Sequence, residues 1–495
     1  MSQIPILLII VPLAAPPLLF IAAKASRFAI TAVAALIATA SAGLAIAATA
    51  AVRQTGILVY HVGGWTAQQG IVLAVDSLSV IMLALIQLVF LPVLLFPSEQ
   101  SERVRRLTLL FLLLAALHGV VLTADIFNMY VFIEIGVIVS YALLNQGNAP
   151  DRLEGSFKYL LMSSLGSLLV LLAIALVYSA SGSLNLAYLA RTFPDAPRAL
   201  RSTVLALLTA GFGLKFGAVP FHAWKPDAYG SAPPALAALA SGVVAKVPLY
   251  CLVRIVSLLY GFSAPSTAPF LALLAILGSA SVVVGHAMAL KQERLNRLLS
   301  FSSVAHIGYI MIGFATATVV GIEGAVFHML NHGILKAGLF LVSAAIVAHL
   351  QSDEISRMVE ISRPMLFPAL PFALLALGMI GIPPVVGFVS KWVIVLSGVA
   401  GGLLIPGILV ALGGFAALWY YQRVTLTFCT LIHDLPFPRL FFSWPERLPA
   451  LFLTTISVAL FAGIPWLHPY MRRAALALMD TGPLVDRILF QAGSL

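Results

Sequence analysis

The chain has 495 residues, of which 61% are hydrophobic and 9% are charged, with a mean hydropathy of +1.05 and a formal net charge of +10. A soluble domain carries about 25% charged residues, so this composition excludes a soluble protein and predicts an all-α integral membrane protein. The positive charge then reflects cytoplasmic loops and not binding of nucleic acid. The two cysteines, Cys251 and Cys429, lie in apolar segments without a metal-ligand spacing, so we expect no disulfide and no metal site.

Apolar runs of about 20 residues mark helices that cross a membrane. The first run, 4–23, has no basic segment before it and no convincing cleavage site, which favours a spanning helix over a signal peptide. The run 366–400 contains two glycines and two prolines between positions 381 and 387, which predicts a broken helix. The fourteen expected spans are 4–23, 28–50, 71–96, 106–123, 125–146, 157–180, 202–221, 235–260, 268–289, 298–318, 321–347, 366–400, 403–430 and 449–468.

Basic residues alternate between the two sides of these spans. The loops after even-numbered spans hold four of them: Arg53, Arg191, Arg198 and Arg201. Those after odd-numbered spans hold fifteen: Lys24, Arg27, Arg103, Arg105, Arg106, Arg152, Lys158, Lys225, Lys291, Arg294, Arg297, Arg357, Arg363, Arg439 and Arg447. Because basic loops stay in the cytoplasm, both termini are expected on the outer side. The segment 469–495 is amphipathic, which predicts that it lies on the membrane surface or on a partner.

Two interrupted spans resemble each other. Residues 213–221 and 381–391 each combine glycines, proline and one lysine within an apolar helix, and they belong to the seventh and twelfth spans. An odd offset of five spans reverses the orientation in the membrane. Paired interrupted helices of opposite orientation are typical of inverted repeats, in which they mark the transport site.

The ionisable residues deep inside spans are few. Glu134 is the one carboxylate well within a span, and the lysines within spans are Lys215, Lys246, Lys336 and Lys391. Each buried charge costs about 2.5–3.5 kcal/mol on insertion scales, so such residues usually serve a function. We expect Glu134 to pair with one of the lysines. The pair either acts as a switch, in which the lysine moves away and frees the carboxylate for a proton, or is a static contact between helices.

His328, His332 and Lys336 follow one another at intervals of four residues. This spacing places all three on one face of a helix over about 12 Å. Histidine titrates near neutral pH, so the column is a candidate proton wire. Two alternatives remain from the residues alone, a metal pair and buried structural histidines.

Prolines lie close to three of the lysines. Pro220, Pro248 and the pair at 383–384 should free the carbonyls of Phe216, Val244, and Met379 with Ile380. Free carbonyls within a membrane are tolerated where they face water or protein, so hydrated pockets are expected beside the lysines. Simple kinks for helix packing are the alternative.

Other polar residues give weaker signals. His306 follows two serines and would extend the relay, whereas His222 and His306 both also fit buried structural histidines. Lys225 and Asp227 are interpreted as loop residues that form a local ion pair. Arg254 either extends to the outer interface or belongs to an exit path.

Several stretches together resemble the large antiporter-like subunits of Mrp-type cation/proton antiporters, and their relatives in respiratory complex I and membrane-bound hydrogenases. The D-type Mrp subunit is the most similar of these, by the sequence motif at residues 128–132, by the lysine at 391 and by the chain length. The similar stretches, within residues 70–430, are 125–134, the Lys215 segment through 228, 299–309, 328–336 and 381–391.

This resemblance implies a fold of fourteen helices with two inverted five-helix units, helices 4–8 and 9–13. The expected division is 1–105 for the first three helices, 106–260 and 261–430 for the two repeats, and 431–495 for the last helix and tail. It also implies that Glu134 and Lys215 form the family's ion pair, that Lys246 connects the two halves, and that the histidine column leads to Lys391 at the exit. Two departures are Lys225, where relatives carry an apolar residue, and residues 230–234, which lack the usual acidic residue and threonine.

The function that follows is proton translocation in a multisubunit Na⁺/H⁺ antiporter, by a chain with no active site or cofactor of its own. The alternative is a proton-pumping subunit of a redox complex, in which case the chain is part of an oxidoreductase; an inactive scaffold is a third possibility. Expected partners are other membrane subunits, lipid, protons and Na⁺ passing through the complex. The expected location is a bacterial or archaeal cytoplasmic membrane.

Overall fold

The computed structural model describes residues 3–98, 102–147, 149–361, 366–429 and 442–490. Within them, twelve helices are long and apolar enough to cross a membrane, and one further pair passes the same test but is bent by 86°. The described strands are β1 (Leu58–His61) and β2 (Val72–Val75), an antiparallel hairpin in which Leu58 faces Val75. The protein is therefore a helical multi-pass membrane protein, as the composition predicts, with a small hairpin that was not expected.

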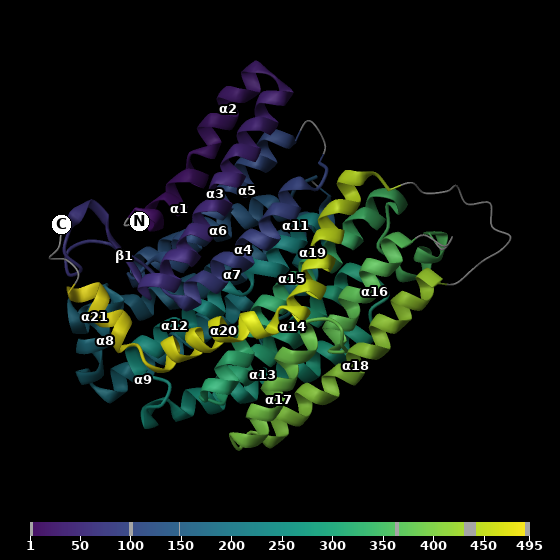
Figure 1. Cartoon of the computed structure of the whole chain (residues 1–495). Helices are drawn as coiled ribbons and strands as arrows, with labels where there is room; N and C mark the ends of the chain where they lie inside the picture. The colour runs from purple at the N-terminus through teal and green to yellow at the C-terminus, as the bar shows by residue number, and fades with distance from the viewer. Residues whose placement is uncertain (1–2, 99–101, 148, 362–365, 430–441, 491–495) are drawn as a thin grey trace.

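The N-terminal helices form one edge of the molecule (Figure 1). The helices α1 (Ile4–Leu13) and α2 (Ala15–Ala25) form one span, and α3 (Arg27–Thr55) returns beside it after Ser26, whose hydroxyl accepts a hydrogen bond from the Ala29 amide. The helix α4 (Ser77–Leu95) is largely buried further inside.

The middle of the chain consists of two successive groups of helices, whose three most buried spans are α11–α12, α14 and α15. The first group is α5 (Arg103–Leu122), α6 (Ile126–Leu144), α7 (Pro150–Ser181), α8 (Leu186–Thr192), α9 (Arg198–Phe216), α10 (Trp224–Ser231), α11 (Pro234–Leu239) and α12 (Val247–Tyr260). The second is α13 (Ala268–Leu290), α14 (Leu295–Ala315), α15 (Val319–Leu350), α16 (Leu366–Ile380), α17 (Gly387–Ala400) and α18 (Leu404–Cys429).

Both predicted helix breaks are present. The helix α9 ends at Gly217 (φ 62°), where a Cβ would meet the Trp224 ring at 3.2 Å, and α10 follows after a turn. The helix α16 ends before Gly381 (φ 93°), where a Cβ would lie 3.0 Å from Cδ of Lys391, and α17 begins at Gly387. Glycine is required at both ends because L side chains rarely adopt these backbone angles.

A third break was not predicted. Between α11 and α12 the chain forms a π-helical turn over Ala240–Val244, directly before Lys246. Such turns interrupt the regular hydrogen bonds of a helix and release backbone groups for other partners. The turn therefore leaves backbone groups near Lys246 available to other hydrogen-bond partners.

The C-terminal part differs from the predicted last span. The helix α19 (Trp444–Ala462) is followed, after a bend of 86°, by α20 (Ile464–Met479) and then by α21 (Gly482–Phe490). Figure 1 shows α20 lying across the other helices. The amphipathic character predicted for 469–495 is confirmed for α20, but its apolar face covers α4 and α15 of this same chain, and residues 491–495 lie outside the described part. The basic residues Arg363 and Arg439 also lie outside the described part.

Candidate functional site

Glu134 and Lys215 form an ion pair between α6 and α9. Lys215 Nζ lies 3.1 Å from Glu134 Oε1, and its side chain is 2% exposed, whereas the Glu134 side chain is 26% exposed. Ser167, on α7, accepts a hydrogen bond from Lys215 and donates one to the carboxylate. The lysine is thus held by two partners, one of which is the carboxylate predicted from the sequence.

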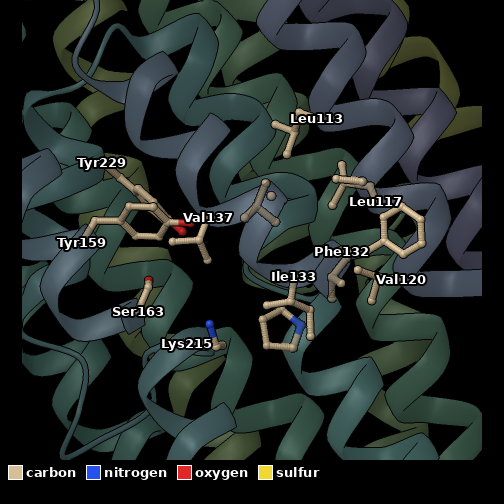
Figure 2. Close-up of a pocket in the computed structure, with 15 residues that line it drawn as sticks. Leu113, Leu117, Val120, Phe132, Ile133, Val137, Tyr159, Ser163, Lys215 and Tyr229 are labelled. Atoms are coloured by element: carbon tan, nitrogen blue, oxygen red, sulfur yellow. The ribbon is translucent and has the colours of Figure 1, made fainter. Parts of the chain in front are cut away.

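A cavity of about 30 Å³ adjoins Lys215 (Figure 2). Its lining includes Lys215, Ser163 and Tyr159 on one side, and Val244, Val247 and Pro248 from the segment around Lys246. A cavity of this size holds a water molecule where polar groups are available. The cavity joins Lys215 to the segment around Lys246, and the hydration expected of pockets beside the lysines stays a prediction.

Lys246 is fully buried at the π-helical turn. Its ammonium donates to the Ser241 carbonyl, whereas the carbonyl that Pro248 was expected to free is that of Val244. The Ser241 hydroxyl lies 2.8 Å from the Ser303 hydroxyl on α14, and Ser303 donates to the Leu299 carbonyl at 2.9 Å. These serines form a polar bridge from the first group of helices to the second.

Lys336 is at the far end of that bridge. The side chain is fully buried, and Nζ donates to the Leu299 carbonyl at 3.0 Å and to the Ser302 hydroxyl at 3.1 Å. The Tyr421 hydroxyl accepts a third hydrogen bond at 3.2 Å. Within the described residues no carboxylate pairs with Lys336.

The predicted column of histidines is buried and is joined by His306 from α14. His306 Nδ1 lies 3.0 Å from His328 Nε2, and His328 Nδ1 lies 2.9 Å from the Ser390 hydroxyl on α17. The ring of His332 stacks on that of His306 at 4.8 Å. Among the described residues no group of three or more metal-ligating side chains is arranged to hold a metal ion.

Lys391 lies at the broken end of α16. Its ammonium donates to the carbonyls of Met379 and Ile380, the latter at 3.0 Å. These are the two carbonyls that the prolines at 383 and 384 were predicted to free. The prolines were expected to leave these carbonyls free beside a hydrated pocket, and in the structure the lysine itself is their donor.

The break after α9 differs from the prediction. The Phe216 carbonyl, which Pro220 was expected to free beside Lys215, instead accepts a hydrogen bond of 2.6 Å from Lys225 Nζ. Lys225 is fully buried, so its interpretation as a loop residue paired with Asp227 is wrong. Asp227 pairs with Lys158 at 2.8 Å and with Arg297 at 3.1 Å. The chain folds back after Gly217, which turns Lys225 inward, and sequence spacing does not reveal this reversal.

Lys225→Met is expected to lower the thermal stability of the purified assembly. The change leaves the Phe216 carbonyl buried without a donor, a loss of about 1–3 kcal/mol. Lys158→Met is the matched control, because Lys158 is 41% exposed and its removal is expected to shift stability by no more than about 0.5 kcal/mol. Equal midpoints of thermal unfolding for the two variants would contradict a supporting role for Lys225.

Arg254 and His222 lie outside this chain of contacts. Arg254 is 5% exposed and forms a bidentate ion pair with Asp76, at 2.6 and 2.7 Å, which rules out the prediction that it extends to the interface. His222 is partly buried in the turn between α9 and α10, and its Nδ1 has no hydrogen-bond partner in the described structure. The structure does not bring His222 into contact with the histidine column.

Sequence reasoning missed several polar partners. Ser167, Ser241, Ser390 and His286 each contact a predicted site residue or its neighbour, as described above and below. Serine is common in apolar helices, where it bonds to the backbone of its own helix, so its sequence position alone carries no signal. His286 lies within an apolar span, so of these four residues it is the one that the sequence could have indicated.

The chain matches the family described as "NADH:quinone oxidoreductase/Mrp antiporter, TM" over residues 123–417. It is 33% identical over 443 residues to the N-type subunit of the NADH-quinone oxidoreductase of Desulforudis audaxviator, covering 86% of each chain. It is 28% identical over 440 residues to the D-type subunit of the Na(+)/H(+) antiporter of Bacillus subtilis, covering 88% of this chain and 89% of the relative.

Solved structures share the whole fold. A chain of the Mrp complex from Dietzia sp. DQ12-45-1b has a TM-score of 0.89 at 23% identity, with 99% of each chain covered. A chain of the membrane-bound sulfane sulfur reductase, an archaeal respiratory membrane complex, has a TM-score of 0.92 at 27% identity, with 99% of this chain and 100% of that chain covered. Both structures are multisubunit membrane complexes.

Proposed function

The chain belongs to the NADH:quinone oxidoreductase/Mrp antiporter transmembrane family, and from this premise we propose that it is the proton-translocating subunit of a multisubunit Na⁺/H⁺ antiporter. It is a multi-pass membrane protein whose partners are other membrane subunits. The name of the Bacillus subtilis relative, a D-type antiporter subunit, and the D-type motif at residues 128–132 support the antiporter reading.

One observation carries the proposal. The site contains a series of buried lysines, and within the described residues only the lysine at one end of the series is paired with a carboxylate. Lys215 has Glu134, whereas Lys246, Lys336 and Lys391 donate to carbonyls and hydroxyls within the described structure. Carbonyls and hydroxyls accept hydrogen bonds from a lysine without neutralising its charge. A cation in such a site responds strongly to any charge that moves nearby, because screening is weak in a medium of low dielectric constant.

The proposed coupling begins at Glu134. A proton that reaches this partly exposed carboxylate neutralises it, and Lys215 then loses the attraction that holds it. The lysine shifts into the adjoining cavity toward Lys246, whose own positive charge becomes less favourable.

The proton that Lys246 releases reaches Lys336 through water beside the serine bridge. It does not pass along the bridge itself, because the Ser241 and Leu299 carbonyls accept hydrogen bonds but have no proton to pass on. A proton then leaves through the histidines and Lys391.

The proposal extends to organisation and orientation. Residues 1–105 and 431–495 flank two inverted units at 106–260 and 261–430, and the breaks at α9–α10 and α16–α17 support this division. We place the chain in a bacterial or archaeal cytoplasmic membrane with both termini outside, on the distribution of basic residues. Na⁺ passes through the complex, and lipid covers the exposed apolar faces.

A second candidate function is a proton-pumping subunit of a redox complex. The relative from Desulforudis audaxviator is named as part of an NADH-quinone oxidoreductase, and this observation favours the second reading. The proton path within the chain would be the same in both cases. The partner subunits therefore decide between them.

Everted vesicles from cells that produce the whole assembly test the proposal. Addition of Na⁺ to vesicles with an imposed pH gradient is expected to dissipate that gradient, as reported by a pH-sensitive dye. Vesicles without the assembly serve as the control. No response to Na⁺, together with flavin or iron–sulfur subunits in the purified assembly, would contradict the antiporter and support the redox complex.

A further inference from the structure

A second set of titratable side chains lies beside the histidine column. His286 on α13, Tyr309 on α14 and Tyr420 on α18 are each no more than 4% exposed. The Tyr309 hydroxyl lies 2.6 Å from His286 Nε2, and the Tyr420 hydroxyl lies 3.2 Å from His286 Nδ1. Both nitrogens of this imidazole are therefore engaged by phenols that carry transferable protons.

Each end of this set reaches a buried lysine or its neighbours. The Tyr420 hydroxyl donates at 3.2 Å to the Ser302 hydroxyl, which also accepts from Lys336 at 3.1 Å. At the other end, Lys391 Nζ lies 5.1 Å from the centre of the Tyr309 ring. The Tyr309 ring also lies 4.8 Å from the ring of His306, which contacts His328.

The histidine column itself is interrupted at its inner end. Both ring nitrogens of His332 are buried without a hydrogen-bond partner among the described residues. Its contact with His306 is a parallel stack, with planes 7° apart, so no hydrogen bond joins the two rings and a proton that passes through His332 needs a water molecule between the nitrogens. The hydrogen bonds from Lys336 instead continue through Ser302 and Tyr420.

We propose that Ser302, Tyr420, His286 and Tyr309 form a second proton route between Lys336 and the Lys391 region, parallel to the route through His332. This inference rests on the proposed function. Lys336 transfers a proton to the Ser302 oxygen as the Ser302 hydroxyl proton passes to Tyr420. The Tyr420 proton moves to His286 Nδ1, the Nε2 proton moves to Tyr309, and the Tyr309 proton leaves toward His306 or Lys391 through water. One proton enters, one leaves, and each group ends neutral.

The directions of the hydrogen bonds determine which groups must reorient before the next proton transfer. In the structure Tyr420 donates to Ser302, so it accepts from His286 Nδ1, and His286 Nε2 accepts from Tyr309. These are the directions left after a proton has travelled outward, away from Lys336 and toward Tyr309, so the reorientation precedes the next transfer. Outward transfer needs both phenol hydroxyls to rotate and the imidazole to exchange tautomers, steps that groups with two engaged nitrogens and rotatable hydroxyls can make.

Paired variants distinguish parallel routes from a single one. Tyr420→Phe and His332→Ala each block one of the two routes, so each is expected to reduce exchange in everted vesicles by about twofold. The double variant blocks both routes and should fall to the background, so the effects of the two changes are not additive. A double variant as active as His332→Ala alone would overturn the inference. So would complete loss in Tyr420→Phe alone, which would indicate one route in series.

His286→Gln separates relay from support. A glutamine side chain both donates and accepts hydrogen bonds but cannot pass a proton through a ring, so in the His332→Ala background it should abolish exchange while the assembly still forms. Retained exchange would mean that His286 only positions its neighbours and would overturn the inference. Tyr260→Phe is the control, because it removes another buried tyrosine hydroxyl, which donates to the Arg201 carbonyl at 2.7 Å. Full exchange in both Lys215→Ala and Glu134→Ala would instead overturn the proposed function.

Discussion

Replacing Lys215 with alanine is expected to abolish Na⁺-dependent proton exchange in everted vesicles while leaving the assembly intact. The residue is the one buried lysine of the site that has both a carboxylate partner and an adjoining cavity within the described structure. Without its ammonium, protonation of Glu134 no longer moves a charge toward Lys246. The carboxylate, which is partly exposed, can then be neutralised in place, so the fold is retained.

Glu134→Ala should give the same loss of exchange, because the variant removes the other partner of the ion pair. Lys215 then lacks the counter-ion that holds it at one end of its path, and it stays permanently on the side of the cavity. Glu134→Asp, which keeps the charge, should retain part of the exchange. The matched control is Lys158→Ala, a lysine that pairs with carboxylates at 41% side-chain exposure. Full exchange in both Lys215→Ala and Glu134→Ala would rule out the proposed coupling.

Arg254→Met is expected to cause a large loss of stability. It removes the partner of Asp76, which is 3% exposed and accepts two hydrogen bonds from the guanidinium. Breaking a buried ion pair from one side costs about 3–5 kcal/mol, because a charge remains without compensation. A marked fall in the midpoint of thermal unfolding of the assembly in detergent is the expected measurement.

The double variant Asp76→Asn with Arg254→Met should recover most of that loss. The asparagine still accepts the hydrogen bond from the Ser79 amide, 2.9 Å in the structure, that begins α4, and no buried charge is left. The exposed pair Arg191–Asp486, also 2.6 Å long, provides the control, since Arg191→Met should change stability by about 1 kcal/mol at most. No recovery in the double variant would mean that Arg254 stabilises through contacts other than Asp76.

The local pattern of residues predicted some contacts well. A proline removes one backbone donor and frees a carbonyl at a fixed distance along the chain, and the Met379 and Ile380 carbonyls expected to be freed by Pro383 and Pro384 accept hydrogen bonds from Lys391. Glu134 had to find a cation within the membrane, and the pairing with a lysine is confirmed. Roles in proton transfer for these residues stay predictions.

Predictions failed where the chain reverses direction. Lys225 and Asp227 are two positions apart, yet the turn after Gly217 buries the lysine on Phe216 and leaves the carboxylate with Lys158 of α7. The π-helical turn before Lys246 was also not predicted, and the carbonyl that accepts from Lys246 is that of Ser241 in this turn. A bend of 86° after Ala462 turned the expected end of the last span into a helix that covers α4 and α15.

By itself the sequence determined that this protein spans the membrane many times, where two of its spans break, and that Glu134 and four lysines lie within the spans. These properties follow from transfer of each side chain out of water and from backbone chemistry within a few residues. The tertiary structure alone decided which lysine meets which carbonyl, that Asp76 neutralises Arg254, and that His286 joins two tyrosines beside the column. Those contacts join helices distant in sequence, and the packing of apolar faces, which is not directional, sets the positions from which polar groups then find their partners.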